Sequence, residues 1–196
     1  MGTAVAGVGI AAIVLGALAA VLVIALLWGI ATYNALTRAR IGAEGAFSGI
    51  DVELRRRHDL VPNLVNTVKG YATHERQALE AVIAARAAAV RPNMSMEERV
   101  QAEQGLSGAL GRLMAVAEAY PDLKANQNFL QLQGELSQVE NRIAGARGGY
   151  NGAVEPYNAM ARQFPALVVA RLLGFRDMPF YQVDDAAQRN APVVQF

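Results

Sequence analysis

Hydrophobic and polar positions divide the chain into one continuous apolar segment followed by several amphipathic ones. Apolar residues fill the segment from Ala4 to about Trp28, and the first charged side chain is that of Arg38. A helix of about 25 residues is about 37 Å long, more than the roughly 30 Å of a bilayer's hydrocarbon core. We therefore expect residues 1–32 to form an uncleaved transmembrane anchor. A cleaved signal peptide is the alternative, but it would carry Lys or Arg before a shorter apolar stretch.

The helical pattern continues beyond the anchor. Apolar residues recur every three or four positions from Leu36 to Val61, so the first helix is expected to run on from the anchor into a bundle. Pro62 lacks a backbone N–H and disfavours helix at the residue before it. We therefore predict a kink or short break between His58 and Pro62, and a second helix over residues 62–90.

Two further helices follow. The sequence Ser95-Met96-Glu97-Glu98 has the pattern of a capping box and predicts a third helix that ends near Tyr120. From Phe129 to Phe164 the apolar positions alternate by three and four over five heptads, which favours a fourth helix with a coiled-coil-like seam. Several residues should soften or bend its middle: Gly145, Gly148, Gly149, Gly152 and Pro156.

The last part of the chain contains one short apolar segment. Residues 166–175 are apolar apart from Arg171 and either cap the bundle or lie on a membrane surface. Together these patterns predict an all-α protein, in which an N-terminal transmembrane helix continues into a helical bundle with coiled-coil-like packing. The expected domains are the anchor (1–32), the bundle (33–176) and an irregular tail (177–196).

Composition and charge narrow the functional classes. The formal net charge is +1, which provides no basic face of the size that nucleic-acid binding needs. There is no cysteine, so disulfides, thiolate nucleophiles and cysteine metal sites are excluded. The two histidines form adjacent pairs, His58-Asp59 and His74-Glu75, whose members point to different sides of a helix. We expect no metal site, no cofactor and no catalytic residues.

Basic residues give the expected orientation. Arg38 and Arg40 follow the apolar segment, and no Lys or Arg precedes it. The positive-inside rule then places the short N-terminus outside and the helical domain in the cytoplasm, with a single pass through the membrane.

Two sets of polar residues are candidates for contacts outside the bundle. Arg55, Arg56 and Arg57 form a basic cluster that could bind an anion or a lipid headgroup, since Arg pairs readily with phosphate. The alternative is a solvated face with ion pairs such as Arg55–Asp51 or Arg57–Glu53.

The second set lies beside the seam of the fourth helix. It consists of Asn141, Arg142, Asn151 and Asn158. These side chains are expected either to fix helix register through hydrogen bonds or to contact a partner.

Several motifs in order resemble the LemA family of bacterial membrane proteins. The resemblance covers nearly the whole chain after the anchor. It is carried by Asp51-Val52, Arg56 to Val65, Val68 to Tyr71, Tyr120 to Asn126, Phe129 to Leu132, Glu140 to Ile143, Tyr150-Asn151, Tyr157-Asn158, Phe164-Pro165 and Gly174-Phe175. The chain departs from the family pattern at Gly148-Gly149 and Pro156, where helix formers are more common.

The resemblance implies an elongated, mostly antiparallel helical bundle that is anchored in the inner membrane of a bacterial cell. It implies no particular reaction. Members of the family are linked to cell-envelope and membrane-organising roles, and one branch to bacterial organelle membranes. Our first hypothesis is a non-enzymatic scaffold that self-associates as a homo-oligomer at membrane lipids and organises the membrane or recruits partners. The alternative is a regulatory adaptor that presents a helical surface to one specific partner protein in the membrane or envelope.

Overall fold

The structure, a computed structural model, describes residues 2–72 and 74–182, with backbone alone for residues 2–12 and 14. The described chain is all-helical and contains no strand, which confirms the predicted fold class. Its helices are α1 (Gly2–Lys69), α2 (Arg76–Ala89), α3 (Met96–Ala117), α4 (Pro121–Lys124), α5 (Gln127–Arg162) and α6 (Ala166–Leu172). The predicted tail lies mostly outside the described residues, and its first part, 177–182, is neither helix nor strand.

The chain divides into two compact units. Unit 1 comprises Met1–Glu44 and Gly152–Met178, and unit 2 comprises Gly45–Asn151 and Pro179–Phe196. Helices α1 and α5 each contribute residues to both units. The domain boundaries expected from the sequence remain predictions.

Helix α1 passes through Pro62 without a break and ends at Lys69, so the predicted interruption between His58 and Pro62 is wrong. Proline cannot donate to the carbonyl four residues earlier, which here belongs to His58. Arg86 of α2 replaces that donor, because its Nε lies 2.7 Å from the His58 carbonyl oxygen and donates to it. The second helix consequently begins at Arg76 rather than at Pro62.

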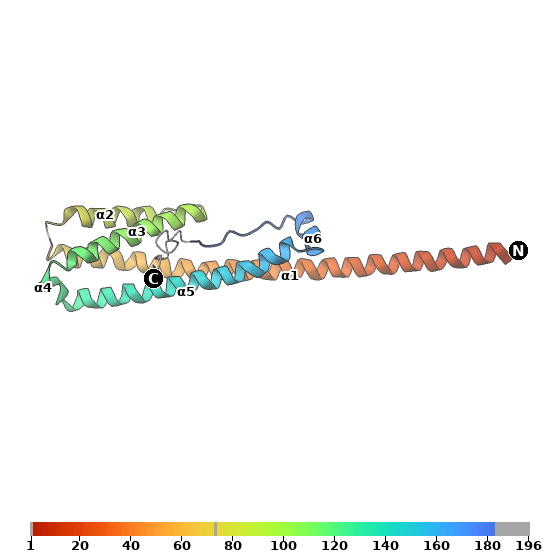
Figure 1. Ribbon diagram of the computed structural model, residues 1–196, viewed down its shortest axis with the longest axis horizontal. Coiled ribbons are helices and arrows are strands. Elements are labelled where there is room, and N and C mark those ends of the chain that lie inside the picture. Colours follow the sequence, from red (N-terminus) through yellow and green to blue (C-terminus); the bar gives the residue numbers. More distant parts are fainter. Residues whose placement is uncertain (1, 73, 183–196) are drawn as a thin grey trace, which may run out of the picture. The chain divides into compact units, whose positions relative to one another are not determined.

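Unit 2 is a bundle in which successive helices alternate in direction. Figure 1 shows α2 and α3 lying along the second part of α1, with α5 completing the bundle. One apolar core joins all of them, through residues such as Leu64, Leu79, Leu113, Leu123 and Phe129. The coiled-coil-like seam remains a prediction.

The predicted capping box opens α3. The Glu98 amide donates to the Ser95 hydroxyl (3.1 Å), and the Ser95 amide donates to the Glu98 carboxylate (2.8 Å). The bounds of α3 follow the sequence prediction closely.

In unit 1, the described side chains of α1 before Trp28 are exposed and, from Ile13 on, uniformly apolar. Helix α1 is the one described helix that is long and apolar enough to cross a membrane. Further along α1, Leu36 is buried against α5 and α6 through Tyr157, Ala161 and Ala170.

Helix α6 ends with a reversal of the chain at Gly174. Its φ of 76° lies in the left-handed region that favours glycine. The Phe175 amide then donates to the Ala170 carbonyl (2.9 Å), as in a Schellman motif. The reversal carries the Phe175 ring back to Tyr33 of α1, where the ring centroids are 5.7 Å apart in an edge-to-face arrangement.

Helix α5 is continuous from Gln127 to Arg162, in spite of its glycines and Pro156. The predicted softening therefore produces no interruption. The glycines and Pro156 are exposed, whereas the side chains that bind α5 to each unit are buried. Tertiary packing outweighs the local propensity in this helix.

Candidate functional site

A cluster of charged side chains lies buried in unit 2. Arg57 of α1 is fully buried, and its Nη2 donates to Glu103 of α3. Its Nη1 donates to the Ser107 hydroxyl (2.9 Å) and to the partly exposed Glu140 of α5 (2.6 Å). The Nε2 of His58 lies 2.9 Å from the second Glu103 oxygen and donates to it. We call these five residues the Arg57 cluster.

The ionised forms are stabilised within this cluster. Burial opposes the charge on Arg57, but the attraction of Glu103 and Glu140 outweighs it and raises the pKa of the guanidinium. Burial likewise opposes the charge on Glu103, but the hydrogen bond from His58 and the attraction of Arg57 together lower the pKa of this carboxyl. The cluster is therefore an internally compensated set of charges that ties α1, α3 and α5 together.

A second ion pair joins the same two helices, α1 and α3, closer to the start of α3. Arg99 donates from Nη1 to Asp51 (2.6 Å), and its guanidinium lies 5.5 Å from the centroid of the Phe47 ring. Phe47 packs edge-to-face on Tyr150, with ring centroids 5.5 Å apart. These contacts attach α3 to α1 through both charge and ring faces.

After α6, the residues that belong to unit 2 bind the dipeptide Tyr150-Asn151 of α5 through hydrogen bonds. The Asn151 amide exchanges two hydrogen bonds with the backbone of Tyr181, at 2.8 and 3.1 Å. The Tyr150 hydroxyl donates to the Pro179 carbonyl (2.7 Å). The buried Tyr181 ring also contacts the Arg147 guanidinium, 4.8 Å from its centroid, and burial raises the pKa of the Tyr181 hydroxyl in spite of Arg147. We call this set the Asn151 clamp.

The same arrangement occurs in unit 1. The Asn158 amide exchanges two hydrogen bonds with the backbone of Met178, both at 2.9 Å. The Tyr157 hydroxyl donates to the Arg176 carbonyl (2.7 Å). In this set, the Asn158 clamp, one asparagine side chain satisfies both backbone polar groups of Met178.

The predicted basic cluster is split by the structure. Arg57 is not available for a headgroup, because it is buried and bound by carboxylates, and this part of the prediction is corrected. The ion pairs of the alternative prediction also differ from those in the structure. Arg57 pairs with Glu103 and Glu140 rather than with Glu53, and Asp51 pairs with Arg99 rather than with Arg55. Arg55 and Arg56 are exposed, and an anion contact by them remains a prediction.

Arg55 has further basic neighbours. It lines a groove of about 330 Å³ together with Arg91 and Arg99, next to Asp51. Because Asp51 already pairs with Arg99, the exposed charges that face this groove are mainly positive.

The predicted register or partner residues fall into two groups. Asn151 and Asn158 bind the chain's own segment between Met178 and Tyr181. Asn141 and Arg142 are exposed on α5, so a contact with another molecule remains a prediction for them.

Sequence reasoning missed Glu103, Ser107 and Tyr181. Glu103 lies three residues before the buried Leu106, within the apolar stripe of α3. A carboxylate at an inward position, facing a stripe in α1 that contains Arg57, is the signal that could have found the pair. Nothing in the local sequence marks Tyr181 as buried.

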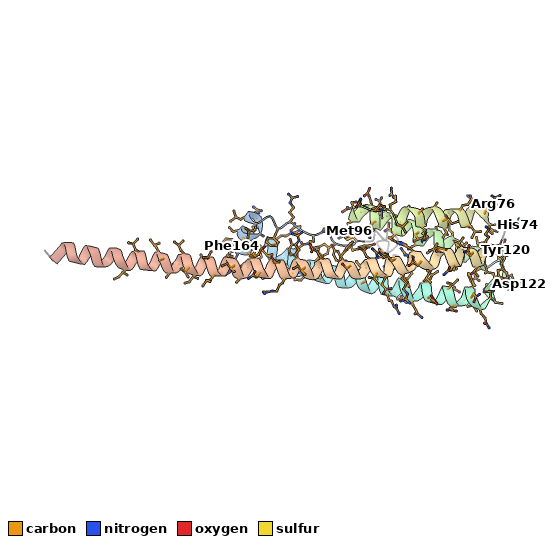
Figure 2. All side chains as sticks on the ribbon, turned by 180° about the vertical axis from the view of Figure 1, so that it is seen from behind. His74, Arg76, Met96, Tyr120, Asp122 and Phe164 are labelled. Atoms are coloured by element: carbon orange, nitrogen blue, oxygen red, sulfur yellow. The ribbon has the colours of Figure 1, made fainter. Side chains whose placement is uncertain are left out.

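The described residues hold no group of three or more His, Asp or Glu side chains that could bind a metal ion. Glu75, next to His74, instead accepts a hydrogen bond from the Tyr120 hydroxyl (3.0 Å). Figure 2 shows His74 and Tyr120 at the same end of unit 2, together with Arg76 and Asp122. The polar contacts of the Arg57 cluster attach helices to one another, and those of the two clamps attach α5 to the segment that follows α6.

Comparison with known proteins adds a family and several relatives. A model described as the LemA family matches residues 46–196, more than half of the chain. Magnetosome protein MamQ 2 of Paramagnetospirillum magneticum is 33% identical over 47% of this chain. Magnetosome protein MamQ of Magnetospirillum gryphiswaldense is 25% identical over 83% of this chain and 68% of its own length. Protein LemA of Metamycoplasma hominis is 24% identical over 78% of this chain and 69% of its own length.

The match spans only 34% of the length of MamQ 2, and the same share of MamQ 1 from the same organism. None of these names is the name of an enzyme.

Proposed function

Since the chain belongs to the LemA family, as its motifs predicted, we propose that it is a non-enzymatic, membrane-anchored helical scaffold. It binds further copies of itself and organises the membrane or recruits partners there. The names of its relatives, which include magnetosome proteins, are compatible with such a structural role.

The anchor is the apolar part of α1. Its described leucine, isoleucine and valine side chains are exposed, and a lipid environment would cover them as water cannot. Arg38 and Arg40 follow this part, which supports an orientation with the helical units in the cytoplasm of a bacterial cell.

The observation that carries self-association is an exposed face of α1 in unit 2, made of Gly45, Gly49 and Val52. These residues are separated by four and three positions and therefore lie on one side of the helix. A Cβ atom added at Gly45 or Gly49 would meet nothing within 4 Å, so packing inside the chain does not require glycine at either position. Each exposed glycine nevertheless costs about 1 kcal/mol of helix stability relative to alanine. These glycines allow a helix of another copy to approach closely, which accounts for glycine at both positions.

The test is the mass of the full chain in detergent, measured by size-exclusion chromatography with light scattering. We expect an oligomer, and we expect Gly45→Leu with Gly49→Leu to shift it toward the monomer. Leucine forms helix better than glycine, so a loss of association would not reflect unfolding. Gly105→Leu, at an exposed glycine of α3, is the matched control and should leave the mass unchanged. A strictly monomeric wild-type protein would refute self-association.

Crosslinking in cells separates the scaffold from the adaptor. The chain has no native cysteine, so Val52→Cys provides a single reactive position on the proposed face. A ladder of homo-oligomers supports the scaffold. One dominant band with a different protein would instead support an adaptor that serves a specific partner.

A further inference from the structure

Helix α6 has one buried side and an apolar surface that is exposed. Ala170 is buried against Leu36 and Tyr157, so α6 is attached to the other helices of unit 1. Figure 1 shows α6 next to α1 within this unit. Val168, Leu172 and Leu173 are exposed, and Leu172 keeps 79% of its surface accessible. Phe164, labelled in Figure 2 at the turn that precedes α6, is equally exposed.

The position of α6 along α1 is fixed by two contacts. Ala170 meets Leu36, and the chain reversal at Gly174 brings Phe175 onto Tyr33. Trp28 and Tyr33 stand at the end of the apolar run of α1, where aromatic residues mark a membrane–water interface. The exposed leucines of α6 are therefore beside the last turns of the proposed anchor.

An apolar groove lies between the two helices. Its volume is about 570 Å³, and its walls are five residues of α1 between Ala25 and Tyr33 and, in α6 and just after it, Val169, Leu172 and Leu173. Gly29 forms part of the wall, and a Cβ atom there would meet nothing within 4 Å. The Tyr33 hydroxyl is the one polar side-chain group among these lining residues.

We infer that this groove holds an acyl chain of a bilayer lipid, so that α6 is a second membrane contact beside the transmembrane helix. The inference rests on the proposed anchoring of α1. The groove is continuous with the exposed apolar surface of α1, and the lipid that surrounds this surface is the nearest apolar occupant. Arg171, exposed in the last turn of α6, has a stem long enough to extend its guanidinium toward lipid phosphates.

Fluorescence quenching by lipids tests this contact. The full chain is reconstituted in vesicles of phosphatidylcholine that carries bromine on one acyl chain, and bromine quenches only an indole that it can approach. Trp28 is the single tryptophan of the chain, so the wild-type protein reports on the anchor alone. The variant Trp28→Phe with Leu172→Trp reports on α6.

The matched control is Trp28→Phe with Ile41→Trp. Ile41 is an exposed apolar residue of the same unit, and it lies about 20 Å beyond Trp28 along α1 at 1.5 Å per residue. We expect the indole introduced by Leu172→Trp to lose as much fluorescence as Trp28 does, and the indole introduced by Ile41→Trp to lose almost none.

A second substitution tests the groove itself. Adding Gly29→Leu to the Leu172→Trp variant fills the space of an acyl chain and should reduce the quenching, whereas Gly16→Leu, at another open glycine of α1, should not. Each failure is distinct. If Trp28 is not quenched, the proposed anchor is refuted and the inference with it. If Trp28 is quenched and the indole from Leu172→Trp is not, α6 does not contact lipid and the inference alone is refuted. Disulfide formation between two copies of a Leu172→Cys variant, without quenching, would assign the groove to a second copy and overturn the inference in the same way.

Discussion

The two parts of α1 contrast in the residues that they expose and bury. Before Tyr33 the helix exposes leucine, isoleucine and valine side chains, and after it the helix fully buries Arg57. The comparison shows that burial follows the partners available at each position rather than side-chain polarity alone. Around Arg57, carboxylates and a hydroxyl replace water. Along the apolar part, the exposed side chains need no hydrogen-bond partner and the helix satisfies its own backbone, as the proposed transmembrane anchor requires.

The largest effect should come from breaking the buried pair. Glu103→Leu leaves the buried Arg57 charge without its closest partner, and we expect the free energy of unfolding to fall by about 3–5 kcal/mol. Denaturant unfolding of the full chain in detergent, followed by circular dichroism, measures this loss. The double variant Glu103→Leu with Arg57→Met should recover most of it, because neither charge is then left alone. If the double variant were as unstable as the single one, the charge compensation described here would be wrong.

Placing a charge in the apolar part tests the other side of the comparison. Leu22→Arg should disfavour membrane insertion by about 2.5–3.5 kcal/mol, if lipid surrounds this exposed position. The fraction of the protein that resists carbonate extraction from membranes measures insertion. Leu130→Arg changes a similarly exposed leucine of α5 and is the control, for which we expect no loss. Equal extraction of the two variants would contradict the anchor.

The clamps provide a neutral counterpart to the Arg57 cluster. Asn158→Ala removes both partners of the Met178 backbone, and we expect a loss of about 1–3 kcal/mol, the penalty for unsatisfied buried polar groups. Hydrogen exchange at the Met178 amide should accelerate with it. Asn141→Ala, at an exposed asparagine of the same helix, should change stability by less than about 0.5 kcal/mol. Unchanged exchange at Met178 in Asn158→Ala would show that this clamp does not hold the segment.

The smallest expected effect is the dependence of stability on pH. The pKa of Glu103 is lower in the folded protein than in the unfolded chain, because the His58 hydrogen bond and the Arg57 charge outweigh the cost of burial. Its contribution is therefore complete above the unfolded pKa, about 4.3 for glutamate, and is lost as the pH falls through the folded value. Unfolding free energies measured across this acid range should fall less steeply for Glu103→Gln than for the wild type. Glu80→Gln, at an exposed position of α2, should leave the slope unchanged.

Structural features that depend only on residues close together in the sequence were predicted correctly. The apolar run predicted the exposed part of α1, and Ser95 and Glu98 predicted the start of α3 to the residue. Both are decided within a few positions of the chain: the first by side-chain polarity and the second by two hydrogen bonds over one helical turn.

Contacts between distant residues could not be predicted in this way. Arg57 occupied an inward position of the α1 stripe, but its partners Glu103 and Glu140 are 46 and 83 residues away. The two Tyr-Asn dipeptides were recognised as motifs, yet their partners belong to a segment that was expected to be irregular. The hydrogen bonds between these dipeptides and that segment are visible only when both are placed in the structure.

The hydrogen bond from Arg86 to the His58 carbonyl makes the path of α1 conditional on another helix. A proline in mid-helix leaves an oxygen that seeks a donor, and here a guanidinium from α2 provides it. While α2 is still unfolded during synthesis, Arg86 cannot donate to the His58 carbonyl. The missing hydrogen bond then favours a hinge in α1 at Pro62. Docking of α2 thus supplies the hydrogen-bond donor that α1 itself lacks at this carbonyl, and it links the completion of the bundle to the continuity of α1 through Pro62.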